Sequence, residues 1–127
     1  MKSKKETVES IEVNGVKYVR ADAVSKQRQS VKLGTFTMVR TSSAGVFAGH
    51  LKSRTGQEVV LNDAVRIHYW NGAASLSELA MRGSSKPSDC QFPVAVDEVL
   101  LTQAVELIPI STLAEKQIKE LAGKWTK

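Results

Sequence analysis

The residues of this chain that could do chemistry gather between Met38 and Gly83, and they suit holding a phosphorylated ligand better than cutting one. The first group follows an alternating strand pattern, and its members are Arg40, Thr41, Ser42, Ser43, Ala44 and Gly45. We expect the backbone amides of this turn, at Ser43, Ala44 and Gly45, to form a concavity that binds an anion. An arginine beside such amides is chemically apt for a diphosphate.

A second group follows some twenty residues later, with Arg66, Tyr69, Trp70 and Ser75. Arg66 is the one charged residue of an apolar and aromatic strand pattern. One of Tyr69 and Trp70 should point outward by strand alternation and can stack a base. The helix that begins at Ser75 offers a second anion site.

Each of these residues also has a purely structural interpretation. Arg40 can pair with Glu58 across strands, Tyr69 and Trp70 can belong to the core, and Ser75 can be only a helix cap. Whether the residues converge on one ligand therefore depends on the fold.

The patterns that support catalysis are missing from the sequence. His50 and His68 fall on different expected strands, without the ligand spacing of a zinc site. Asp97 and Glu98 are neighbours on a strand and so point to opposite faces. Cys90 has no evident activating partner, and we interpret it as an inert, partly buried thiol. With no phosphate loop, dinucleotide fingerprint or serine elbow, we expect no enzyme, no metal and no cofactor.

The charge of the chain is unevenly distributed. The formal net charge is +5, and residues 1–40 carry nine Lys and Arg against four Asp and Glu, whereas residues 41–127 carry nine of each. The excess indicates a basic N-terminal arm that can touch nucleic acid, although lysine-rich termini often serve only solubility. Because the N-terminus lacks the apolar region of a signal peptide and a single cysteine forms no disulfide framework, we expect a cytoplasmic protein that does not enter a membrane.

A length of 127 residues fits one domain with a small appendage. Residues 11–19 read as a β-hairpin that turns at Asn14-Gly15. A short helix begun at Asp22 and a linker at residues 27–30 follow it. We therefore divide the chain into a basic hairpin and linker, residues 1–30, and a ligand-binding domain, residues 31–127.

The second domain alternates strands with turns. Strands are expected at residues 32–40, 46–52, 58–61, 65–70, 94–101 and 103–110, with turns at 42–45 and 53–56 and a bend at 62–64. Ser75 and Glu78 form a capping box for a helix that stops at Gly83. Ser111 or Thr112 caps a final helix with an apolar stripe of Leu113, Ile118 and Leu121. The prediction is an α+β fold, a small bent antiparallel sheet or barrel with two short helices, preceded by the N-terminal hairpin.

The same segments carry a resemblance to a known family. The runs RTSSAGVF, EVVL, AVRIHYW and GAASLS resemble the pattern RTxSAGV, EVxL, ARRxxYW and GAxSLS of small phage proteins, the first-described type of Thoeris anti-defence sponge. The resemblance covers residues 31 to the C-terminus, and the leading VNGVKYVR is similar to a segment often found ahead of that domain. Two residues depart from the pattern: Val65 stands where a second basic residue is expected, and Asp63 where a neutral one is usual.

The resemblance implies binding without catalysis. Such sponges sequester cyclic ADP-ribose isomers made by bacterial TIR-domain proteins, so that the downstream effector is not triggered in the infected host. They are homo-oligomers built on dimers, with ligand held between subunits, and some members bind cyclic oligonucleotides at a separate site. The positions expected to bind ligand come from three of the four motifs: Arg40, Thr41, Ser43, Ala44 and Gly45, then Arg66, Tyr69 and Trp70, then Ser75 and Ser77.

Two other functions fit parts of the sequence. A small barrel that binds nucleic acid would use the basic arm and a stacking aromatic ring. A phage structural or adaptor protein would use its sheet for assembly. Salt separates the first from a sponge, because binding of nucleic acid through residues 1–40 weakens steeply as salt rises.

Overall fold

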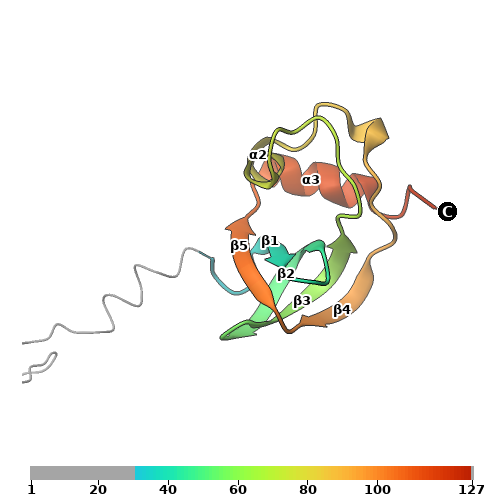
Figure 1. Ribbon diagram of the computed structural model, residues 1–127. Helices are drawn as coiled ribbons and strands as arrows, with labels where there is room; N and C mark the ends of the chain where they lie inside the picture. Colours follow the sequence, from blue (N-terminus) through green and yellow to red (C-terminus); the bar gives the residue numbers. More distant parts are fainter. Residues whose placement is uncertain (1–30, 127) are drawn as a thin grey trace, which may run out of the picture. The chain divides into compact units, whose positions relative to one another are not determined.

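The computed structural model describes residues 31–126, so the expected hairpin, short helix and linker of residues 1–30 lie outside the described range. The described residues form an α+β fold with five strands and two α-helices, which confirms the predicted class (Figure 1). The strands are β1 (Phe36–Thr41), β2 (Val46–Thr55), β3 (Glu58–Arg66), β4 (Val96–Leu101) and β5 (Ala104–Pro109). The helices are α2 (Leu76–Arg82) and α3 (Thr112–Leu121), and a 3₁₀ turn spans Pro87–Asp89.

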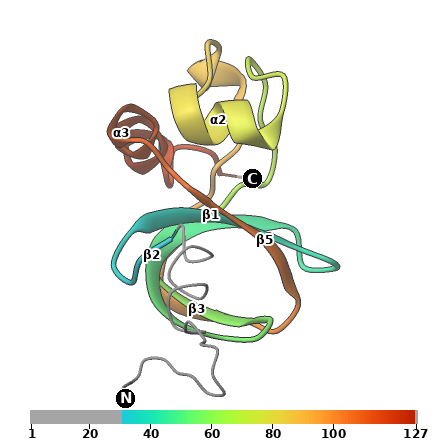
Figure 2. The same cartoon turned by 90° about the vertical axis from the view of Figure 1, so that its left-hand side faces the viewer.

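The five strands make one antiparallel sheet in the order β4-β3-β2-β1-β5. The two edge strands, β4 and β5, are joined by only Thr102 and Gln103, so the sheet must curl to bring its edges together at that end. The Ala104 amide donates to the Gln57 carbonyl at 3.0 Å, which ties the tip of the β2–β3 hairpin to the start of β5. Figure 2 shows the resulting curl viewed along its opening.

Irregularities in β2 and β3 supply the curvature. The register shifts between Ala48 and His50, where β3 carries one extra residue and Asp63 takes a left-handed φ of 50°. A bulge of this kind bends its strand and increases the local twist. Gly49 sits opposite the bulge, and a Cβ there would lie 2.9 Å from the Asn62 carbonyl oxygen, so the close approach of the strands requires glycine.

The curled sheet has two apolar faces. One lines the inside of the curl and the other is covered by α2 and α3, which lie on the same side of the sheet (Figures 1 and 2). Met38 and Val39 show the alternation, because Met38 faces the helices and Val39 faces the inside. The buried residues inside the curl are Val39, Phe47, Leu51, Val59, Leu61, Ala64, Leu101 and Ala104. On the face that the helices cover, the buried strand residues are Phe36, Met38, Ala48 and Val65.

Local capping signals place both helices where the sequence predicts them. The Ser75 hydroxyl accepts a hydrogen bond from the Glu78 amide at 3.1 Å, and the Ser111 hydroxyl accepts one from the Ala114 amide at 3.1 Å. Each bond satisfies an amide that the first turn of a helix leaves unpaired. Gly83 follows the last turn of α2 with a φ of 75°. The predicted cap at Ser75 and the predicted stop at Gly83 are therefore confirmed, but the Glu78 carboxylate bonds the Ala74 amide and not the Ser75 amide, so the capping box is only half formed.

Three predicted details of the strands are wrong. The first strand begins at Phe36 instead of residue 32, because residues 32–35 make a turn in which the Thr35 amide donates to the Lys32 carbonyl. The turn predicted at 53–56 lies at residues 56–57, since β2 runs on to Thr55. The expected third and fourth strands are one strand, β3, because the bend at Asp63 is absorbed as a bulge; it ends at Arg66 instead of Trp70.

The predicted apolar stripe of the last helix is partly wrong. Ile118 is fully buried and Leu121 is half-buried, but Leu113 is 67% exposed. Ala114 takes the inward position instead, four residues before Ile118 and so on the same face of the helix. Leu113 is rotated by about 100° from Ala114 and points away from the sheet.

Candidate functional site

The β1–β2 turn, residues 42–45, is held by the side chain of Thr41. Its hydroxyl donates to the Gly45 carbonyl at 2.8 Å and accepts from the Ala44 amide at 2.8 Å, and Thr41 is buried. The Ala44 amide, which the sequence assigns to an anion-binding concavity, thus already has an internal acceptor. Thr41 acts as the support of this turn, with its polar atoms directed into the turn itself.

The two serines of the turn fasten it to the neighbouring β4–β5 turn. The hydroxyls of Ser42 and Ser43 both donate to Oε1 of Gln103, the former at 2.9 Å. The Ser42 amide also donates to the Gln103 carbonyl at 3.0 Å. Although both serines are exposed, their hydroxyls are therefore partnered within the protein.

Arg66 reaches the same turn from the end of β3. Its guanidinium lies over the Phe47 ring, 4.4 Å from the centroid, and Nη1 donates to the Ala44 carbonyl at 2.8 Å. Arg66 is exposed, and none of the carboxylates in residues 31–126 makes an ion pair with it. The structure thus brings Arg66 and the β1–β2 turn together and leaves a positioned cation at the surface. Stacking on an aromatic ring restricts the guanidinium before any anion arrives.

Arg40 lies on the other face of the sheet. It pairs in register with Val46 on β2, whereas Arg66 pairs with Phe47. Because consecutive strand residues point to opposite faces, the side chains of Arg40 and Arg66 leave the sheet on opposite sides. Arg40 Nε pairs with Glu106 Oε1 at 2.9 Å, an exposed ion pair across β1 and β5. Glu106, and not the predicted Glu58, is therefore the ion-pair partner of Arg40. The structure does not bring Arg40 and Arg66 together within one chain.

One ring of the aromatic pair points outward, but strict alternation does not decide which, because β3 ends at Arg66 and the neighbours His68 and Tyr69 are both exposed. Tyr69 is 48% exposed, while Trp70 is half-buried and packs against the helix-side core. The backbone of Tyr69 makes an isolated bridge with Gln91, with N–O distances of 3.3 and 2.8 Å. Trp70 thus serves packing, and only Tyr69 of the predicted pair presents its ring to solvent.

His68 and Trp125 form an aromatic contact that sequence spacing does not predict. Their ring centroids are 4.9 Å apart and their planes differ by 18°, a stacked arrangement. His68 is exposed directly after the buried Ile67. Trp125 follows the last helix and lies far from His68 in the sequence, so only the tertiary fold relates them.

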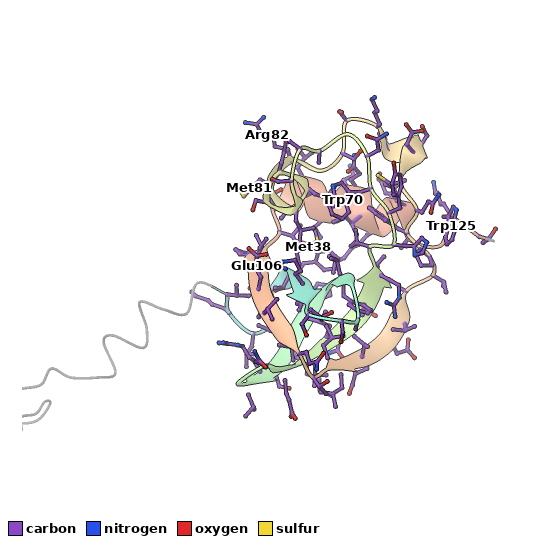
Figure 3. All side chains as sticks on the ribbon, in the orientation of Figure 1. Met38, Trp70, Met81, Arg82, Glu106 and Trp125 are labelled. Carbon is purple, nitrogen blue, oxygen red and sulfur yellow. The ribbon has the colours of Figure 1, made fainter. Side chains whose placement is uncertain are left out.

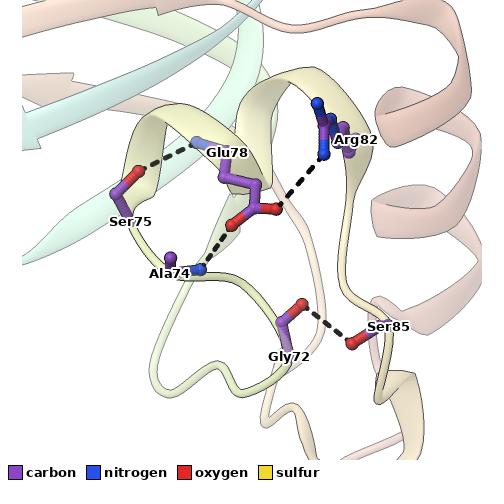
Figure 4. Close-up of polar contacts among 6 residues, drawn as sticks. All are labelled: Gly72, Ala74, Ser75, Glu78, Arg82 and Ser85. Atoms are coloured by element: carbon purple, nitrogen blue, oxygen red, sulfur yellow. Dashed lines mark hydrogen bonds and ion pairs between the residues drawn. The ribbon is translucent and has the colours of Figure 1, made fainter.

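The helix start at Ser75 is occupied by the protein's own groups, as Figure 4 shows. Glu78 Oε1 accepts from the Ala74 amide at 2.6 Å, and its other oxygen lies 3.8 Å from Arg82 Nη1. The carboxylate stands where the sequence predicts a bound anion, and it already interacts favourably with the helix dipole. Ser75 is therefore a cap, while Ser77 is exposed on the surface of the same helix and lines an open depression beside Met81.

Within residues 31–126, no group of three or more His, Cys, Asp and Glu side chains has the arrangement of a metal site. In the same part of the chain no helix is long and apolar enough to cross a membrane. Cys90 is buried, with Sγ 3.7 Å from the Asn71 carbonyl oxygen.

Comparison with known proteins places most of the described region in one family. Residues 34–118 match a family model described as Domain of unknown function (DUF6948). The match begins just before β1 and ends within α3, so it covers the curled sheet, α2 and most of α3. No curated protein and no solved structure matches the chain.

Proposed function

This chain belongs to the DUF6948 family, and we propose that it is a phage anti-defence protein that sequesters cyclic ADP-ribose isomers. It acts in the cytoplasm of the infected bacterial host, where bacterial TIR proteins make these signals for Thoeris immunity. The protein binds the signal stoichiometrically and leaves it chemically unchanged. The likeness of its sequence motifs to the sponge pattern supports this function.

The observation that carries the proposal is the placement of Arg66. A guanidinium stacked on Phe47, tied to the Ala44 carbonyl and unpaired with any described carboxylate is ready to receive a phosphate. A charge-assisted hydrogen bond from arginine to phosphate is among the strongest polar contacts that a protein makes. The partnered hydroxyls of Thr41 and Ser43 favour a role in holding the turn rigid, which places Arg66 reproducibly.

The separation of the two arginines means that a sponge that uses both for one ligand must be an oligomer. Arg40 and Arg66 lie on opposite faces of one sheet, so a diphosphate held by both must contact Arg40 of one copy and Arg66 of a second copy. Tight binding needs an enclosed site, and Arg66 is exposed in a single chain. A second copy packed against this surface would enclose the ligand. The proposed assembly is a dimer, or an assembly of dimers.

Mixing two variants tests this composite site. Arg40→Ala and Arg66→Ala should each lose affinity for a cyclic ADP-ribose isomer in titration calorimetry. Unfolding and refolding the two variants together should restore about one quarter of the sites, because half of the random dimers then hold one intact site of two. If the refolded mixture binds no better than either variant alone, the two arginines do not share a site across copies.

The activity itself is tested by titrating the purified protein with a TIR-derived cyclic ADP-ribose isomer. Heat denaturation and chromatography of the supernatant then identify what was bound. Tight binding and release of unaltered ligand are expected of a sponge, whereas altered ligand would identify an enzyme. Failure to bind this ligand, with binding of nucleic acid that collapses as salt rises, would favour the basic arm of residues 1–40 as the functional element.

A further inference from the structure

His68, whose ring stacks on that of Trp125, lies two residues after Arg66, the last residue of β3. The pairing with β2 continues one residue beyond the end of β3, because the Ile67 amide donates to the Val46 carbonyl at 2.9 Å. Ile67 is buried, whereas Arg66 and His68 are both exposed. Residues two apart on an extended segment share a face, at a separation of about 7 Å. A cation and an aromatic ring therefore stand side by side on one surface.

The C-terminal segment holds the indole of Trp125 against the ring of His68. The Gly123 amide donates to the carbonyls of Phe92 at 3.0 Å and Pro93 at 3.1 Å, which anchors the chain two residues before Trp125. Trp125 is half-buried while His68 stays exposed, so the tryptophan covers one side of the imidazole and the histidine retains accessible surface. Trp125 also lies on the opposite side of the molecule from Glu106 in the view of Figure 3, and so away from the ion pair of Arg40.

We propose that His68, backed by Trp125, is the platform on which the base of a nucleotide ligand stacks while Arg66 takes the neighbouring phosphate. This inference rests on the proposed function and names the base-contacting residue of that site. His68 touches the ligand, and Trp125 is a positioning residue that holds the imidazole plane. The platform replaces Tyr69 and Trp70 as the stacking element, because Trp70 packs into the core and Tyr69 lies outside the Arg66–His68 face.

Physical chemistry favours this pairing of groups. Any nucleobase has a π-face, and a stacked ring contributes to affinity without a need for specific hydrogen bonds. A ring already held in place by a second ring loses less conformational freedom when the base arrives. The guanidinium of Arg66 is similarly held over Phe47, so both halves of the nucleotide would meet groups in fixed positions.

Calorimetry on the full chain with a cyclic ADP-ribose isomer tests the two roles. His68→Ala should weaken binding by about 10-fold to 100-fold, the usual loss for one stacked base. His68→Phe keeps a flat ring and should restore most of the affinity. Trp125→Ala should weaken binding by a smaller factor, whereas Lys124→Ala, a change in the same segment that spares both rings, should leave it unchanged. Wild-type affinity in His68→Ala, beside lost affinity in Arg66→Ala, would place the base elsewhere.

A second measurement separates failure of the platform from failure of the sponge function. In NMR titrations of the wild-type protein, AMP should shift the His68 ring protons upfield, and ribose 5-phosphate should not. The AMP shift should be reduced in Trp125→Ala while the melting temperature of that variant stays near that of wild type. If AMP leaves the His68 protons unmoved, the platform is refuted even where a cyclic ADP-ribose isomer binds. If the AMP shift appears but that isomer does not bind, the platform stands and the sponge function fails.

Discussion

Replacing Gly72 by alanine should destabilise the protein far more than its partial burial suggests. Gly72 has a φ of +83°, which L-residues with a Cβ rarely adopt. A Cβ there would lie 2.5 Å from the Lys86 amide nitrogen and 2.7 Å from the Ser84 hydroxyl. The Gly72 carbonyl also accepts from the Ser85 amide at 2.9 Å, so the two crossing segments are tied together at this point.

The expected loss has two parts. A left-handed conformation costs a residue with a Cβ about 1–2 kcal/mol. Forcing a methyl group against backbone atoms adds about 1–3 kcal/mol, the usual range for overpacking. The free energy of unfolding should therefore fall by about 2–5 kcal/mol, a large part of the total stability of a small domain.

Gly34 provides the matched control for this experiment. It has a similar φ of +91°, but a Cβ there would meet no atom within 4 Å. Gly34→Ala should therefore lose only the conformational part, about 1–2 kcal/mol. Urea denaturation followed by circular dichroism measures both variants through the change in midpoint at constant slope. Equal losses in the two variants would refute the steric argument and leave φ as the whole effect.

Three further predictions concern stability. Ile118→Ala should lower the free energy of unfolding by about 2–5 kcal/mol, because the side chain is fully buried. Leu113→Ala on the same helix should change it by less than about 0.5 kcal/mol. Equal effects in urea denaturation would contradict the observed face of α3. Ser75→Ala should lower the free energy of unfolding by about 1 kcal/mol because the helix cap is lost, whereas Ser77→Ala should leave it nearly unchanged. Thermal melting measures both variants, and an unchanged melting temperature in Ser75→Ala would contradict the cap. Thr41→Val should cost about 1–3 kcal/mol, because it removes two hydrogen bonds that hold the turn, each worth about 0.5–1.5 kcal/mol. Hydrogen exchange at the Ala44 amide should accelerate, and unchanged protection would mean that another acceptor replaces the hydroxyl.

Local features of the fold were predictable because their causes are local. Ser75 and Glu78 are three residues apart, the separation at which a hydroxyl and a backbone amide meet at the start of a helix. The turn at residues 42–45 and the stop at Gly83 follow likewise from residues within a few positions. The strand predictions were wrong where the tertiary structure overrode a local pattern. Asp63 is a residue typical of turns, but in the structure it forms a bulge within one strand.

The candidate site was predictable in its residue types and less so in its geometry. Arg66 was singled out as the charged residue of an apolar strand, and it is indeed exposed and placed against the β1–β2 turn. The side of the sheet on which each arginine emerges depends on strand register, and a shift of one residue reverses it. No pattern in the sequence states that register, so the separation of Arg40 from Arg66 could not be foreseen.

The amino-acid sequence alone determined the α+β class, the helix caps and the types of the candidate binding residues. These depend on interactions between residues close in the chain or on strand alternation. The tertiary structure alone decided that Arg40 pairs with Glu106, that Arg66 stacks on Phe47, and that Trp125 lies against His68. Those contacts join residues far apart in sequence, and they exist only because the curl of the sheet, its register and the path of the C-terminal segment bring the residues together.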